Sequence, residues 1–395
     1  MTEVKGVLAS VSYNCDKGIN NLINGYNIPN PLPWAQIVGP LAAAEDALAR
    51  LDERLANSPI REGWIARTHF HDACASLWLE GELVQLEDLV LHDAGMDIRT
   101  PTHELTRAHA VLRARRRIAG ADARWALTPA GLDARRGKRP AEALQGEGRV
   151  LPGAEDEKER PNQAIDDKEV AGGEAWHAEM AAIDALVARS GRTVAQATNS
   201  RPPERDALAY DPDWDEDRRI ATWRASVNET AHLPPVLAAA LAALTWEAVK
   251  PLQHAHSLGR LLSASLLRAH GKTRVHLACL NAGLRALPQE RRRATGPVAQ
   301  LLVAIDAVAA AAVAGLKDHD RWLLARRQLE RKLADRRSTS KLPALIDVVL
   351  ASPIVSAGMI AKNLGITPRA AQDLVAELAL REVTGRGRYR AWGVI

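Results

Sequence analysis

The chain has 395 residues, enough for two or three domains with a sizeable apolar core. Its formal charge of +4, from 52 basic and 48 acidic residues, is modest for this length and excludes a protein that is basic throughout. Three scattered cysteines outside any CxxC spacing exclude a disulfide framework and a structural zinc site, and they favour a reducing cytoplasmic location.

The N-terminal part of the chain changes character near Pro31. Residues 1–30 show no helical period and are rich in Asn and Gly, which predicts a disordered arm. Apolar residues then recur at spacings of three and four, and Thr102 is a good N-cap, so we predict an N-terminal helical region over 31–118. Basic residues that offset a helix dipole are typical of a solvated helix end. Such a cluster closes this region at Arg113, Arg115, Arg116 and Arg117.

The middle of the chain contains a linker and a second helical region. Residues 119–172 lose periodicity and gain glycine, proline and mixed charge, which predicts a flexible linker. Periodicity returns over 173–337 and predicts a helical core, so the expected fold class is mainly α. The stretch 301–316 is apolar but too short to span a membrane, and we expect a buried helix and no membrane contact. The predicted helices of this core lie near 174–187, 215–227, 235–249, 258–270, 300–317 and 320–335.

Residues 341–395 follow the order helix, helix, turn, helix and short hairpin, which predicts a winged helix-turn-helix. Ala361 and Gly365 stand four apart, where a small residue lets two helices approach and a glycine can adopt the left-handed conformation. Thr367 is a good N-cap and Pro368 suits the first helical position, so the second helix has a clear start.

The outward face of this second helix carries side chains that can hydrogen-bond base edges in a DNA major groove. We therefore predict double-stranded DNA as a partner and transcriptional regulation as the role; the alternative is a winged helix that contacts only protein. The residues predicted to face bases are Thr367, Arg369, Gln372 and Asp373. Arginines at the glycine-rich turn suit phosphate or minor-groove contact, namely Arg386, Arg388 and Arg390. The basic residues that precede this domain in the chain could extend the phosphate-contacting surface. They are Arg326, Arg327, Arg331, Lys332, Arg336, Arg337 and Lys341.

Two segments of the body resemble the core of Fic-domain proteins, which typically transfer AMP from ATP to a hydroxyl side chain. Residues 246–252 and 258–262 are similar to the two helices that flank the phosphate-binding loop of that core, and residues 76–81 (SLWLEG) are similar to its inhibitory motif. The resemblance implies a Fic-like helical bundle in which Glu80 faces Arg260. The residues it places in the cleft are Ser76, Glu80, Lys250, His254, His256 and Arg260.

The chain departs from the Fic pattern at the positions that carry chemistry. Lys250 stands where the catalytic histidine belongs, and a lysine with an ordinary pKa is a poor base at neutral pH. The loop glycines that let backbone amides approach a phosphate are absent, and His254 or His256 could act as a base only from a shifted loop. We therefore expect no enzymatic activity and no cofactor, with the body serving dimerisation or sensing of a nucleotide or small-molecule effector. The alternative is a Fic-type nucleotide-binding or AMP-transferring enzyme with a non-standard active site.

Over residues 32–395 the chain also resembles an uncharacterised family from rhizobia, in which a Fic-like helical body precedes a helix-turn-helix DNA-binding domain. The likeness is strongest in residues 71–117, in residues 272–293 and in the C-terminal domain. No metal site is predicted, because His69 and His71 lie two apart on a helix and point to different faces. A basic turn, Lys272-Thr273-Arg274, suits either an anion contact or an ordinary helix C-cap.

Overall fold

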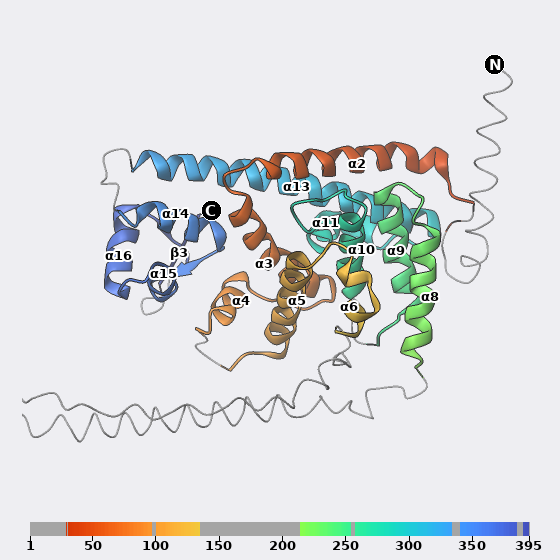
Figure 1. Cartoon of the computed structure of the whole chain (residues 1–395), viewed down its shortest axis with the longest axis horizontal. Helices are drawn as coiled ribbons and strands as arrows, with labels where there is room; N and C mark the ends of the chain where they lie inside the picture. Colours follow the sequence, from red (N-terminus) through yellow and green to blue (C-terminus); the bar gives the residue numbers. More distant parts are fainter. Residues whose placement is uncertain are drawn as a thin grey trace, which may run out of the picture. The chain divides into compact units, whose positions relative to one another are not determined.

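The computed structural model describes residues 29, 31–96, 100–134, 214–253, 257–333, 340–384 and 390–394. Regular structure in this part of the chain is almost entirely α-helical (Figure 1), which confirms the predicted mainly α class. The described residues up to Leu132 and from Asp215 onward form one compact unit, so the helical body and the C-terminal residues pack together. The predictions for residues 1–28 and 135–213 lie outside the described residues.

Two long helices, α2 (Trp34–Ala56) and α13 (Pro297–Arg331), lie side by side along one side of this unit (Figure 1). The indole of Trp64 on α3 (Arg61–Leu79) donates to the carbonyl oxygen of Gly315 at 3.1 Å. A Cβ at Gly315 would lie 2.8 Å from Leu51, so the glycine permits this close packing. By length and composition α13 could cross a membrane, but here it packs against α2, α9, α11 and α14.

The centre of the body is α9 (Pro235–Val249), which is apolar on nearly every side and is buried against α8 (Glu216–Glu229), α10 (Leu258–Ala269) and α13. The rings of Trp223 and Trp246 meet edge to face with centroids 5.2 Å apart. A Cβ at Gly259 would lie 2.4 Å from the Trp246 ring, so α10 approaches α9 at a residue without a side chain. These apolar contacts form the main core, with contributions from α2 and α13.

Shorter helices complete the body. They are α4 (Leu86–Asp93), α5 (His103–Gly120), the 3₁₀ helix η1 (Trp125–Leu127), α6 (Pro129–Asp133), α11 (Leu280–Ala286) and α12 (Gln289–Arg292). The predicted linker is wrong at its start, because residues 119–134 fold and bury Ala126 and Leu132 in the core. The predicted break near residues 318–319 is also wrong. No glycine or proline interrupts α13 there, and His319 is buried and hydrogen-bonded to Ser58.

The C-terminal residues form α14 (Leu342–Ala351), β1 (Val355–Ser356), α15 (Ala357–Leu364), α16 (Pro368–Glu377), β2 (Arg381–Glu382) and β3 (Ala391–Gly393). The strands make an antiparallel sheet in the order β1-β3-β2, with Trp392 opposite both Val355 and Glu382. Gly365 ends α15 in the left-handed conformation at φ +62°, as predicted. The Thr367 side chain accepts a hydrogen bond from the Ala370 amide at 3.2 Å, which confirms the predicted N-cap of α16.

Candidate nucleic-acid interface

Helix α16 presents a polar face to solvent. Ala371 and Val375 are buried and hold the helix against α15, whose Ile360 and Ala361 are buried in turn. All four residues predicted to face bases are exposed: Thr367, Arg369, Gln372 and Asp373. The structure therefore brings this set together on one accessible stretch of helix.

Arg369 is held only loosely by the protein itself. Its side chain is 87% exposed, and its Nε lies 3.9 Å from Oδ1 of Asp373, which is 73% exposed. An ion pair at this exposure contributes little to stability, since water screens both charges. The guanidinium is thus free to reorient towards another acceptor at small cost.

The second predicted set falls on the turn between β2 and β3. Arg386 and Arg388 lie outside the described residues. Arg390 is described, and its guanidinium pairs with Glu382 at 2.7 Å and lies 5.5 Å from the ring centroid of Trp392. This pairing leaves Arg390 with less uncompensated charge for a phosphate than the sequence alone indicates.

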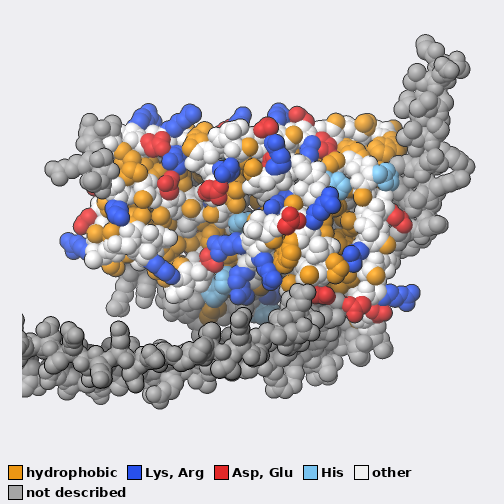
Figure 2. All heavy atoms as spheres, viewed as in Figure 1, with side chains coloured by type: hydrophobic (Ala, Val, Ile, Leu, Met, Phe, Trp, Pro, Cys, Tyr) orange, Lys and Arg blue, Asp and Glu red, His pale blue; other side chains and the backbone are white. Residues whose placement is uncertain are grey.

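Two of the basic residues that precede the C-terminal domain join it to the body. Arg326 pairs with Glu330 at 2.7 Å on its own helix and with Asp347 of α14 at 2.8 Å. The Lys332 ammonium donates to the carbonyl oxygen of Leu378 at 2.6 Å. These side chains fix α13 to the domain, while Arg327, Arg331 and Lys341 are exposed and Arg336 and Arg337 lie outside the described residues. Basic and acidic side chains are interspersed over the face seen in Figure 2, as the modest net charge predicts.

A buried arginine of α3 makes the firmest link to the C-terminal domain. The Arg67 guanidinium donates to the carbonyl oxygens of Val394 at 2.7 Å and Pro353 at 3.2 Å. It also stacks 4.9 Å from the ring centroid of Trp322 on α13. Burial, followed by the charge of Arg321, lowers the pKa of Arg67 to about 10, so the side chain stays charged at neutral pH. The sequence analysis missed this residue, because an arginine among apolar helix positions does not show which carbonyls it will meet.

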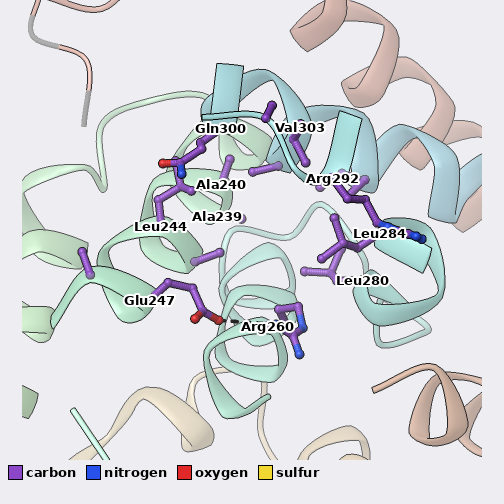
Figure 3. A pocket seen from close by; sticks show the side chains of 16 residues that line it. Ala239, Ala240, Leu244, Glu247, Arg260, Leu280, Leu284, Arg292, Gln300 and Val303 are labelled. Atoms are coloured by element: carbon purple, nitrogen blue, oxygen red, sulfur yellow. Dashed lines mark hydrogen bonds and ion pairs between the residues drawn. The ribbon is translucent and has the colours of Figure 1, made fainter. Parts of the chain in front are cut away.

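The body contains an apolar pocket of about 470 Å³ between α9, α11 and α13, lined mainly by alanine and leucine side chains. At one rim the guanidinium of Arg260 lies 3.4 Å from the carboxylate of Glu247 (Figure 3). The Nε of Arg260 donates to Oδ1 of Asn281 at 2.5 Å. Arg292 and Gln300 supply further polar groups around this otherwise apolar space.

The predicted pairing of Glu80 with Arg260 is wrong. Glu80 follows the last residue of α3 and forms an ion pair with Arg107 of α5, which also pairs with Glu82. Arg107 of α5 takes the place predicted for Arg260 beside Glu80, and Arg260 contacts Glu247 and Asn281 instead.

The remaining residues of the predicted cleft do not form one site. Ser76 is fully buried, and its hydroxyl has no hydrogen-bond partner among the described residues. Lys250 is exposed and ends α9 in the left-handed conformation, at φ +46°. His254 and His256 lie outside the described residues. Of this set, only Arg260 lines the 470 Å³ pocket among the described residues.

A buried polar network joins α3, α5 and α11, and the sequence analysis did not find it. The guanidinium of Arg115, predicted to be solvated, is 1% exposed and donates to Oδ2 of Asp72 at 2.5 Å. Asn281 donates to the same oxygen at 2.7 Å, and the Ala282 amide donates to the other carboxylate oxygen at 2.9 Å. The prediction for Arg115 is therefore wrong, and the carboxylate of Asp72 has its charge and both oxygens satisfied within the fold.

Among the described residues, no group of three or more His, Cys, Asp or Glu side chains could hold a metal ion. The His71 ring stacks on Trp322 with centroids 6.2 Å apart, and burial raises the pKa of the Cys74 thiol to about 12. The basic turn after α10 serves internal ion pairs, with Lys272 bound to Glu45 at 2.5 Å and Arg274 to Asp52 at 3.0 Å.

Comparisons with known proteins agree with this geometry. The C-terminal residues define a helix-turn-helix DNA-binding domain, and a family described as "HTH DNA binding domain" matches residues 342–395. Residues 208–334 match the family "Protein of unknown function (DUF1612)". A relative named "Uncharacterized protein y4cF", from Sinorhizobium fredii, is 48% identical over 373 residues, covering 91% of this chain and 97% of the relative. The chain belongs to an uncharacterised rhizobial family, as the sequence predicted, and its DUF1612 region precedes the DNA-binding domain.

Proposed function

We propose that the protein is a transcriptional regulator of the cytoplasm that reads DNA through a winged helix. The observation that carries the proposal is the exposed polar face of α16 on a helix-turn-helix domain. In this proposal Thr367, Arg369, Gln372 and Asp373 contact bases in the major groove. The antiparallel β1-β3-β2 sheet of the same domain supports the winged form, with Arg386, Arg388 and Arg390 near the phosphates.

In the same proposal the body is a degenerate Fic-like bundle that serves dimerisation or sensing. The contacts of Arg67 and Arg326 support this role, since they tie the C-terminal domain to the helices of the body. A change in the body can therefore reach the DNA-binding helix through packed and hydrogen-bonded elements. A homodimer would bind two half-sites separated by about one turn of the duplex, or a multiple of it.

The first test is to recover genomic DNA fragments bound by the tagged full-length chain and to measure their affinities by gel shift. Arg369→Ala should weaken the best sequence by roughly 1–3 kcal/mol and leave unrelated DNA unchanged, because only the former offers the base contact. Arg390→Ala should weaken all sequences alike and reduce the salt slope by at most about one, because Glu382 already compensates part of its charge.

Arg50→Ala is the matched control for both variants. Arg50 pairs with Asp46 four residues earlier on α2, Arg369 pairs with Asp373 four residues later on α16, and both arginines are exposed. It should bind DNA as the wild type does. No DNA retention at physiological salt by the wild type would favour the alternative, a winged helix that contacts only protein.

A second candidate is Fic-type nucleotide binding or AMP transfer. Arg260, in the first turn of α10 at the rim of the 470 Å³ pocket, is the observation in its favour. Its engagement by Glu247 and Asn281 counts against it. Labelled ATP, tested for binding and transfer with wild type and Arg260→Ala, separates the two candidates. If the wild-type protein neither binds ATP nor transfers the label, the Fic-type candidate is refuted.

A further inference from the structure

A second cavity of the body, of about 390 Å³, is rich in basic groups. It lies between α3, α5, α10 and the segment that follows α10. We call it the basic pocket and define it by Arg61, His69, Arg116, Arg268 and His276. Its size is that of a site for a small metabolite.

The charge of the basic pocket is only partly balanced. Of the three guanidinium groups that line it, Arg61 pairs at 3.0 Å with Glu62, which is 81% exposed, and Arg116 pairs at 2.7 Å with Asp93. Arg268 donates to the neutral carbonyl oxygens of Ile118 at 2.7 Å and Ala121 at 3.4 Å. Partly enclosed positive groups of this kind attract an anion, and guanidinium groups suit carboxylates and phosphates.

Two histidines in the wall of the pocket have ring nitrogens without partners. His69 is 5% exposed and His276 is 3% exposed. Nδ1 of His69 and Nε2 of His276 are buried and lack a hydrogen-bond partner among the described residues. The other nitrogen of His276, Nδ1, is held at 3.1 Å from Oδ1 of Asp52, which fixes the ring. Buried polar atoms left unpaired are costly, so each of these nitrogens gains from a partner such as a ligand hydroxyl or a water.

The form of the His69 ring indicates the chemistry of that partner. Burial, followed by the charges of Arg115 and Arg116, lowers the pKa of His69 to about 3, so the imidazole is neutral at physiological pH. A neutral imidazole nitrogen donates or accepts according to its tautomer, and a hydroxyl group can pair with it in either case. The wall therefore combines guanidinium groups, which suit an anion, with the neutral imidazole of His69, which suits a hydroxyl.

We propose that the basic pocket binds a small hydroxylated organic anion, a carboxylate or phosphate ester of about the size of one sugar. This rests on the proposed function, in which such a molecule is the effector of the DNA-binding protein.

Arg116 gives the pocket a path to the DNA-binding domain. Its guanidinium pairs with Asp93 at 2.7 Å and also lines a neighbouring cavity of about 540 Å³. The wall of that cavity includes Asp347 of α14 and Lys362 and Asn363 of α15. An anion that draws Arg116 from Asp93 changes the charge beside the first helix of the helix-turn-helix pair.

Isothermal titration of the full-length chain tests the site with D-gluconate and glucose 6-phosphate, using uncharged glucose as the comparison. We expect one of the anions to bind at one per chain, and glucose to bind at least tenfold more weakly. The double variant Arg61→Gln/Arg116→Gln should weaken the anion at least tenfold, because two of its three guanidinium groups are lost. Arg61 and Arg116 are 41% and 39% exposed, so the variant should keep the fold. Arg50→Gln, at an exposed arginine of α2 that does not line the pocket, should bind as the wild type does.

His69→Leu supplies a readout independent of charge. It should raise the melting temperature of the free protein, because it removes an unpaired buried nitrogen, and it should weaken the anion. Binding of neither anion, equal binding of glucose, or unchanged affinity in the double variant would each overturn the proposal.

Gel shifts with and without the bound anion separate this inference from the proposed function. We expect the anion to change the DNA affinity of the wild type at least fivefold and to leave that of the double variant unchanged. If the protein binds DNA but no anion, the effector site is refuted and the proposed function is not. If it binds the anion but no DNA, the proposed function is refuted and the anion site is not.

Discussion

The link between the body and the DNA-binding domain can be tested at Arg67. Methionine at this position keeps an unbranched apolar stem and removes the guanidinium that serves the carbonyls of Val394 and Pro353. We expect Arg67→Met to loosen the C-terminal domain while the rest of the protein stays folded.

The magnitude follows from two opposing terms. Each of these two carbonyls, left without its donor, costs about 1–3 kcal/mol, and the longer 3.5 Å contact to the Val349 carbonyl is neglected. The fall of the Arg67 pKa from 12.5 to about 10 corresponds to about 3 kcal/mol by which burial, together with the charge of Arg321, disfavours the charged form, and the variant is relieved of this cost. With mid-range values for both terms, the variant loses about 1 kcal/mol of the free energy that holds the C-terminal domain in place. Global stability then changes little, whereas local opening becomes about fivefold more frequent.

Native-state hydrogen exchange can detect this difference. Amides of residues 342–394 should exchange about fivefold faster in Arg67→Met, and those of α9 should exchange as in the wild type. Arg54→Met is the control, since Arg54 makes an exposed pair with Asp320 at 2.8 Å that joins two helices of the body. Unchanged exchange in residues 342–394, or an equal increase across α9, would refute the anchoring role of Arg67.

Three further predictions concern stability. Burial would raise the pKa of Asp52, but hydrogen bonds from histidine and arginine partners hold it at about 2, below the ordinary 3.8. Above pH 4 this carboxylate therefore contributes about 2 kcal/mol to the free energy of unfolding, and this contribution is lost as pH falls towards 2. In urea titrations, the stability of Asp52→Asn should not show this fall. The pKa of His69 is about 3 in the folded protein and 6.5 in the unfolded chain, so at pH 5 only the unfolded chain takes up the proton. The free energy of unfolding should therefore be about 2 kcal/mol lower at pH 5 than at pH 7.5. In His69→Leu the same urea measurement should show a flatter pH dependence. Gly259→Ala should destabilise by about 2 kcal/mol, since its Cβ meets the Trp246 ring, whereas Gly39→Ala in α2 has open space and should not.

Local signals made the helices predictable. The capping side chains of Thr102 and Thr367 act on amides three residues away, so sequence alone shows where α5 and α16 begin. The proline at residue 368 and the glycine at residue 365 act on their own backbone and are equally local. The fold of residues 119–134 was missed because their order comes from burial of Ala126 and Leu132 against distant helices, which no local pattern shows.

The buried arginines show which contacts local sequence patterns do not predict. Arg115 shares one helical face with Ala108, Leu112 and Ile118, all buried, so its spacing marked it as internal even within a basic run. A buried guanidinium needs acceptors, and a search for a carboxylate on another buried helix face could have reached Asp72. Arg67 likewise has core spacing, three residues from both Trp64 and Phe70. Its acceptors are backbone carbonyls, however, and every residue has one. A sequence can therefore predict that Arg67 is buried, but only the folded chain shows that it binds the DNA-binding domain.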